Sequence, residues 1–161
     1  MYSWWVFLHI VGVFAFLTAH GVSVGVAFKL RRERDPQRIL ALNELSPSSI
    51  SLFYAGLGVL LLGGIVAGFM GRWWGQIWIW LSLGTLIATS IAMYVIAHPY
   101  YRRVAFVARA MAGGSTAVSE EQLDEILLSH IPFTLAGIGF GAILFILFLM
   151  LFKPWSPASL L

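Results

Sequence analysis

The sequence predicts an all-α integral membrane protein, a four-helix bundle that crosses the bilayer four times with both termini on the outer face. Three observations carry this prediction: the composition, the length of the apolar runs, and the placement of the basic residues. Of 161 residues, 60% are hydrophobic and only 11% are charged, and the mean hydropathy is +0.87. A soluble domain carries about 25% charged residues, so this low charged fraction indicates a membrane-embedded chain.

Four apolar runs are each long enough to cross the ~30 Å of hydrocarbon in a bilayer as a helix. Within a single membrane domain, 1–161, we expect spans at about 4–28, 51–70, 77–97 and 131–152, with cytoplasmic connections at about 29–50 and 98–130. The first run has no basic segment before it and no small-residue cleavage site. We therefore expect it to be a retained helix rather than a signal peptide.

The basic residues predict the orientation of these spans. Eight follow the first or the third run, whereas Arg72 and Lys153 lie on the other side. The eight are Lys29, Arg31, Arg32, Arg34, Arg38, Arg102, Arg103 and Arg109. Since loops rich in Lys and Arg stay in the cytoplasm, the bias predicts an N-out/C-out protein of a bacterial-type inner (plasma) membrane. All seven tryptophans fall at the predicted outer interface, which indole rings favour.

Local signals predict short helices in the two cytoplasmic connections. Asp35-Pro36 is typical of an N-cap followed by proline in the first turn, and Ser46-Pro47 repeats the signal before the second span. Gly113-Gly114-Ser115 is expected to interrupt the helical structure of the chain. Ser119 and Gln122 have capping-box spacing, so a helix should begin there and lead into the fourth span.

Composition and motifs exclude several classes of function. The absence of cysteine excludes disulfides and thiolate metal sites. All acidic residues lie in the two connections, which removes the carboxylate relay that pumps and transporters use. No phosphate-binding loop, zinc-protease helix or nucleophilic serine motif is present, so no catalytic residue is predicted. The basic residues flank apolar spans, so their expected partner is the lipid bilayer and not nucleic acid.

Three glycine pairs are candidate packing faces. Gly21 and Gly25, Gly64 and Gly68, and Gly137 and Gly141 each place two glycines one turn apart, which lets membrane helices approach closely. Such pairs also arise by chance in apolar helices. Where they do pack, they would serve a membrane-protein partner or a homo-oligomer.

The four histidines are the candidates for chemistry. His9 and His20 lie inside the first span, where an ionisable group is costly and indicates function. Eleven residues of helix turn by about 1,100°, so both are expected to face the same way about 16 Å apart. His98 ends the third span and His130 opens the fourth, so this pair is best matched in depth. Imidazoles on facing helices are how membrane bundles hold haem b, and copper is the alternative metal. Each histidine could instead form an interhelical hydrogen bond or a helix cap.

The stretch from Leu8 to Phe14, with His20-Gly21 after it and His98-Pro99-Tyr100-Tyr101-Arg102-Arg103 later, resembles small bacterial membrane proteins grouped as a domain of unknown function. The Leu-His-x-x-Gly opening is also similar to CopD-type copper-resistance proteins and HemJ-type protoporphyrinogen oxidases. These likenesses imply copper handling or haem-associated oxidation, with His9 matching a first-helix histidine of those families.

The leading expectation is thus a small b-type haem protein that passes electrons within the membrane. His9 and His20 would line the site, with His98 or His130 as further ligands. The alternatives are a non-catalytic accessory subunit of a larger membrane complex and copper-related transport. Tyr100-Tyr101-Arg102-Arg103 is expected to be an interfacial anchor, because aromatic rings and cations sit well at headgroup level.

Overall fold

The computed structural model describes residues 1–115 and 117–155, with the backbone alone described at 46–50. In this part of the chain every regular element is helical, which confirms the predicted all-α class. The elements are α1 (Tyr2–Leu30), α2 (Pro36–Met70), the 3₁₀ turn η1 (Trp73–Gly75), α3 (Ile77–Ala112), α4 (Glu120–Leu127) and α5 (Ile131–Phe152).

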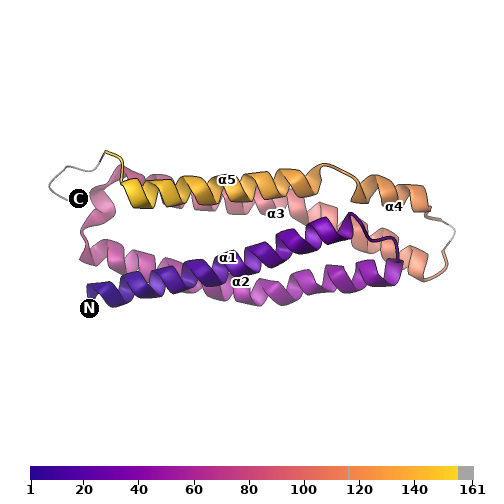
Figure 1. Cartoon of the computed structure of the whole chain (residues 1–161), viewed down its shortest axis with the longest axis horizontal. Helices are drawn as coiled ribbons and strands as arrows, with labels where there is room; N and C mark the ends of the chain where they lie inside the picture. The colour runs from indigo at the N-terminus through magenta and orange to yellow at the C-terminus, as the bar shows by residue number, and fades with distance from the viewer. Residues whose placement is uncertain (116, 156–161) are drawn as a thin grey trace.

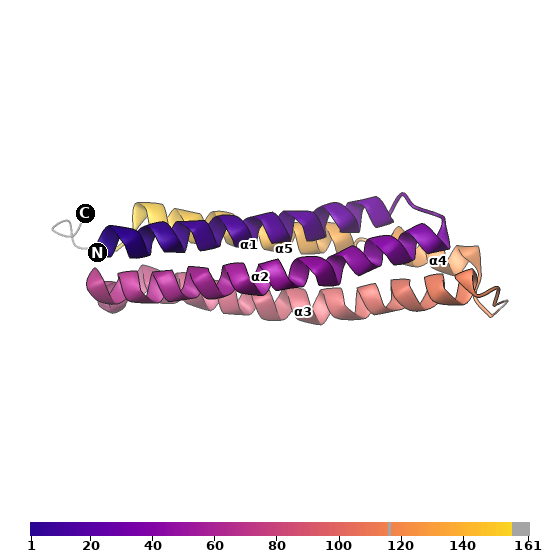
Figure 2. The ribbon, with the colours of Figure 1, turned by 90° about the horizontal axis from the view of Figure 1, so that it is seen from below.

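Four helices are long and apolar enough to cross a membrane, as predicted: α1, the part of α2 from Ser51 to Met70, α3, and α5 with α4 before it. They lie lengthwise along one another, and the start of α1 and the end of α5 share one end of the molecule (Figure 1). The turned view shows α1 beside α2 and α2 beside α3 (Figure 2). The closest packing joins α1 to α2 and α3 to α5, whereas α1 touches α5 at few points. The bundle is therefore two helix pairs with a looser seam between them.

Three local predictions at helix ends are confirmed. Asp35 is the N-cap of α2, and its side chain accepts a hydrogen bond of 2.9 Å from the Gln37 amide. Ser119 and Gln122 form the expected capping box of α4. After α3, Gly114 takes a φ of +72°, which a side chain would disfavour, so the chain turns there.

The expected new helix start at Ser46-Pro47 is wrong. The backbone of α2 is helical without interruption from Pro36 to Met70, and α3 continues through Pro99 to Ala112. A proline removes one backbone donor, but the turns on either side still form their own hydrogen bonds and carry the helix across. At ~1.5 Å per residue the 36 residues of α3 extend about 54 Å, well beyond the hydrocarbon. The connections are thus mostly continuations of the spans.

A cluster of buried apolar side chains lies mainly in these continuations. The cluster joins the end of α1, the first turns of α2, the last turns of α3 and α4. Its buried members are Val26, Leu30, Ile39, Leu42, Tyr100, Val104, Val107, Ala108, Leu123 and Leu127. By contrast, only 6–22% of the most apolar window of each long helix is buried, which leaves most of those faces for lipid. We call this cluster the cytoplasmic core, after the predicted orientation.

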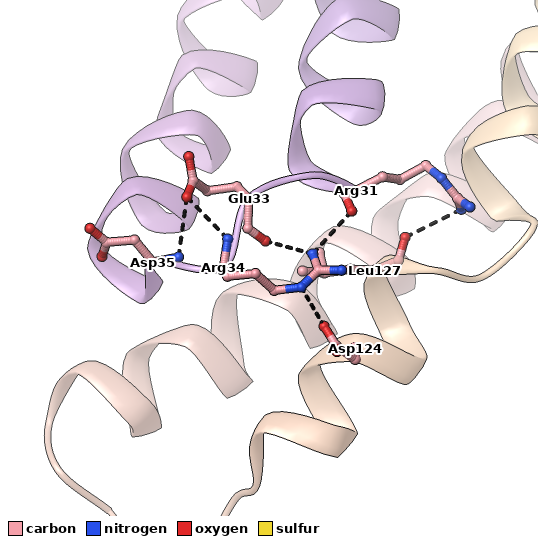
Figure 3. A network of polar contacts seen from close by, with 6 residues as sticks. All are labelled: Arg31, Glu33, Arg34, Asp35, Asp124 and Leu127. Atoms are coloured by element: carbon pink, nitrogen blue, oxygen red, sulfur yellow. Dashed lines mark hydrogen bonds and ion pairs between the residues drawn. The ribbon is translucent and has the colours of Figure 1, made fainter.

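Two arginines fasten the α1–α2 connection to α4 beside this core (Figure 3). Arg31 donates hydrogen bonds to the carbonyl oxygens of Leu127 and Ser129, where α4 ends and α5 has not yet begun. Its guanidinium also lies 4.8 Å from the centre of the Phe133 ring. Arg34 forms an ion pair with Asp124, with 2.7 Å between Nε and Oδ1. The two side chains hold the entry to α5 against the end of α1.

At the opposite end aromatic rings join the helix termini. Tyr2 packs edge-on against Trp73, with ring centroids 5.7 Å apart, and the Lys153 ammonium lies 4.8 Å from the centre of the same indole. Trp80 donates a hydrogen bond of 2.9 Å to the Trp74 carbonyl. The starts of α1 and α3 and the end of α5 therefore meet around η1.

Candidate functional site

Glycines bring α1 and α2 into backbone contact around His9. A Cβ added to Gly12 would lie 2.3 Å from the backbone amide nitrogen of Leu60, and one added to Gly63 would lie 2.6 Å from the backbone amide nitrogen of His9. A Cβ on Gly56 would come within 2.7 Å of the Phe16 nitrogen. No side chain fits at these three positions, so α1 and α2 pack with their backbones in contact.

His9 is fixed by this contact. Its Nδ1 lies 2.7 Å from the Leu60 carbonyl oxygen, and its ring covers Gly64, whose added Cβ would be 2.9 Å from Nδ1. A carbonyl oxygen can only accept, so Nδ1 carries the hydrogen and donates. In the neutral ring Nε2 then keeps its lone pair. Metal-binding histidines use the same arrangement, in which the nitrogen that does not bind metal donates to a carbonyl.

His20 faces a different helix. Its imidazole lies against Gly139 of α5, where an added Cβ would be 2.6 Å from Nε2. The same position is 3.6 Å from the terminal methyl of Met93 on α3. His20 is half-buried and makes no hydrogen bond to any residue that the structure describes. The His20 ring and the end of the Met93 side chain thus both lie beside Gly139, where α1, α3 and α5 come together.

His98 and His130 lie toward the cytoplasmic core, and both are exposed. The His98 ring stacks on Tyr94, with centroids 5.2 Å apart and planes 22° apart. It also lines a hollow formed with Arg102, Arg103 and apolar side chains. His130 is the N-cap of α5, and its carbonyl accepts hydrogen bonds of 3.0 and 3.2 Å from the amide and hydroxyl of Thr134.

The described residues do not gather the histidines into one cluster. No group of three or more His, Cys, Asp or Glu side chains that could hold a metal ion is found among them. His9 and His20, expected to share a face of the first helix, contact α2 and α5 respectively. The reason is that α1 runs obliquely, from α2 at its N-terminal end toward the start of α5 (Figure 1). One face of a crossing helix therefore meets two neighbours in turn.

One of the three predicted glycine pairs packs against other residues, and two are open. Gly64 and Gly68 pack against the rings of His9 and Trp74. Added Cβ atoms at Gly21, Gly25, Gly137 and Gly141 would meet nothing within 4 Å. Two pairs thus leave open helix faces, whereas unpaired Gly12, Gly56 and Gly139 make closer contacts.

Met93 is a candidate donor that the sequence alone does not single out. A methionine in an apolar span is an ordinary packing residue, and nothing in its local sequence distinguishes it from the other methionines. Its significance comes from proximity to His20, which depends on how three helices pack.

Comparison of the chain with protein-family models, with curated proteins and with solved structures gave no match.

Proposed function

We propose that this chain is a four-span protein of a bacterial-type inner membrane, with both termini outside, that binds b-type haem and passes electrons within the membrane. One observation carries the proposal. His20 presents a half-buried imidazole without a hydrogen-bond partner among the described residues, at the seam between the two helix pairs. An ionisable side chain inside a span is costly and calls for a partner, and a metal supplies one.

The orientation is supported by the distribution of side chains over the two ends. The aromatic contacts of Tyr2, Trp73 and Lys153 gather at the end that holds the start of α1 and the end of α5. The arginine contacts and the cytoplasmic core lie at the other end. Aromatic rings at one interface and arginines beyond the other fit a protein with both termini outside.

The seam suits a flat group better than the helix pairs do. Within each pair the helices are closely packed, and in the α1–α2 pair glycine brings backbone against backbone. Between α1 and α5 the contacts are few, and His20 and Gly139 form one of them. Haem would enter by separating α1 from α5, which breaks less packing than parting either pair. Bound there, it would supply a one-electron redox centre within the membrane.

The ligand set that we propose begins with His20. Met93, which lies beside the same glycine, is a second candidate donor, and an imidazole with a thioether would be able to hold haem iron. His9 is the other intramembrane candidate, because its Nδ1 hydrogen bond leaves Nε2 as the basic nitrogen. His98 and His130 stay as predicted further ligands for a haem nearer the cytoplasmic face.

The test is a visible spectrum of protein purified in mild detergent after haem-replete expression, oxidised and then reduced with dithionite. We expect a Soret band that sharpens on reduction in the wild type and is lost in His20→Ala. Met93→Leu should retain haem but lower its midpoint potential, because thioether ligation raises it. Met70→Leu, an exposed methionine of α2, is the matched control. A folded wild-type protein without any Soret band would refute haem binding.

A second candidate is copper handling, which the Met93 thioether favours. Cu(I) prefers soft sulfur and imidazole donors, and a single ion needs far less space than a porphyrin beside Gly139. Metal analysis of the same samples separates the two. Bound copper without a Soret band, lost in both His20→Ala and Met93→Leu, would support copper in place of haem.

A non-catalytic accessory role is favoured by the open glycine pairs. Gly21 with Gly25 and Gly137 with Gly141 present small-residue faces that touch no described neighbour. Close approach of a second membrane helix is what such faces allow, either from a larger complex or from another copy. Gly21→Leu and Gly137→Leu should then abolish co-purification of the partner, or dimerisation, while leaving the monomer folded. A wild-type protein that stays monomeric and captures no partner from native membranes would exclude this role.

A further inference from the structure

We infer that the surface between α3 and α4 binds the headgroup of an anionic phospholipid from the cytoplasmic leaflet. Two adjoining hollows of about 410 and 680 Å³ share five lining residues here. The shared residues are Pro99, Arg103, Phe106, Val107 and Ile126. We call the joined hollows the α3–α4 groove. The inference is independent of haem or copper binding at His20.

The depth of the groove matches the headgroup level of a bilayer. From Ile77 to Ile96 is 20 residues of α3, or about 30 Å of helix, which is the thickness of the hydrocarbon. Ile96 and Ile131, the first residue of α5, line the near end of the groove. Lipid tails would leave the groove past these two isoleucines. The arginines lie one to two turns further along α3, where phosphates are expected.

The groove carries positive charge that is not neutralised by the protein. Arg102 and Arg103 are exposed, and neither forms an ion pair with a residue that the structure describes. The ion pairs found are those of Arg34 and Arg38. His98 lines the groove beside them. Two adjacent guanidinium groups with free donors fit the oxygens of a phosphate. Glu125 lines the wider hollow, and its negative charge would repel an anion bound there.

A second observation points to a missing polar ligand. Tyr100 is only 2% exposed and lines the wider hollow, yet its hydroxyl has no hydrogen-bond partner in the described part of the chain. Ser129 lines the same hollow, and its hydroxyl is also buried without a partner among the described residues. Buried hydroxyls are costly when unpaired, so two beside one hollow indicate that a group with acceptor oxygens belongs there.

Apolar side chains complete an amphiphile site. Phe106 is 68% exposed although it lies beyond the expected hydrocarbon, and Val107 and Ile126 line the groove next to it. A free inorganic anion would leave these surfaces in water. A lipid offers a phosphate to the arginines and covers part of the apolar lining, so lipid is the occupant that satisfies both.

The experiment is a titration of delipidated protein in mild detergent, followed by native mass spectrometry. Dimyristoyl phosphatidylglycerol and dimyristoyl phosphatidylcholine are compared as probes. We expect tighter retention of the anionic lipid, and we expect Arg102→Gln with Arg103→Gln to weaken it by about tenfold or more. Arg32→Gln with Arg109→Gln changes the same net charge at exposed positions outside the groove. That control should lose clearly less affinity. Glu125→Gln should strengthen binding.

Three outcomes would overturn the inference. Equal retention of the two lipids would show that the negative charge of the headgroup does not contribute to binding. Equal losses in the two double variants would show only general attraction to the surface. Displacement of the lipid by millimolar inorganic phosphate would make the groove a site for free anions. Tyr100→Phe gives a separate check, since it should weaken binding of phosphatidylglycerol without lowering the thermal stability of the lipid-free protein.

Discussion

The His9 side chain and the Leu60 carbonyl join α1 to α2 by a hydrogen bond of 2.7 Å, at the point where glycine brings the two backbones together. Leu60 lies inside α2, so its carbonyl is in a position to accept a helical hydrogen bond as well. The imidazole therefore adds a second donor to an oxygen with two lone pairs. This single bond fixes the tautomer of His9 and the register of the closest helix pair.

Replacing His9 by phenylalanine should weaken the bundle modestly. The change keeps a ring over Gly64 but removes the donor, and interhelical hydrogen bonds in membranes contribute about 0.6 kcal/mol on average and up to about 1.7. Unfolding in mixed micelles measures the loss. Ser90→Ala is the control, because the Ser90 hydroxyl bonds only to Leu86 of its own helix. Equal losses in both variants would mean that the His9 bond contributes nothing specific.

Adding one methyl group at Gly12 should separate α1 from α2. The new Cβ would lie 2.3 Å from a backbone nitrogen, which cannot rotate away, so Gly12→Ala should destabilise the fold by about 1–3 kcal/mol. Gly21→Ala, on the same helix but with nothing within 4 Å, should be neutral or slightly stabilising, because alanine favours helix. The free energies of unfolding in detergent test the order. If Gly12→Ala is as stable as Gly21→Ala, the two helices are not in contact there.

Loss of Arg31 should cost more than loss of Arg34. Arg31 donates to the carbonyls of Leu127 and Ser129, and hydrogen bonds from charged groups contribute about 1.5–3 kcal/mol. The Arg34–Asp124 pair is about half exposed, at 48% and 46%, so solvent limits its contribution to roughly 0–1 kcal/mol. Hydrogen exchange of the α4 amides should therefore accelerate more in Arg31→Ala than in Arg34→Ala. The reverse order would contradict the contacts in Figure 3.

Acidification should loosen the α1–α2 connection through Glu33. Backbone hydrogen bonds from the Asp35 and Arg34 amides lower the pKa of this carboxyl below its usual 4.5. A lowered pKa in the folded state means that the stabilisation is complete above pH 4.5 and is lost as the pH falls through the folded value. Glu33→Gln cannot lose a charge, so the difference between its unfolding midpoint and that of the wild type should shrink as the pH falls below 4.5. A constant difference across this range would contradict the assignment.

The sequence predicted helix ends best, because a cap is decided by neighbours along the chain. Asp35 and Ser119 cap their helices through amides two or three residues away, and no other part of the fold is needed. Ser46-Pro47 carried the same local signal and was misleading. The helix there continues because apolar periodic sequence on both sides outweighs one lost hydrogen bond.

Residue type alone was enough to select candidates for the site. Intramembrane histidines stand out by their cost in lipid, so His9 and His20 could be singled out without a structure. Their partners could not, because Leu60, Met93 and Gly139 are ordinary residues of apolar helices. The glycine pairs also show this limit. Spacing alone did not separate Gly21 and Gly25, which are open, from Gly12, which is enclosed.

The position of the cytoplasmic core has a consequence for how this protein responds to solvents. Urea acts on surfaces that water reaches, whereas an ionic detergent such as dodecyl sulfate also invades faces covered by lipid. The cluster around Leu30, Val104 and Leu127 lies beyond the spans predicted at 4–28, 77–97 and 131–152. Urea should therefore melt the two halves of the molecule unequally, fraying the arginine-fastened end while the apolar helices stay in the micelle. The molecule would then have two separable melting events, and a cofactor in the seam would report on only one of them.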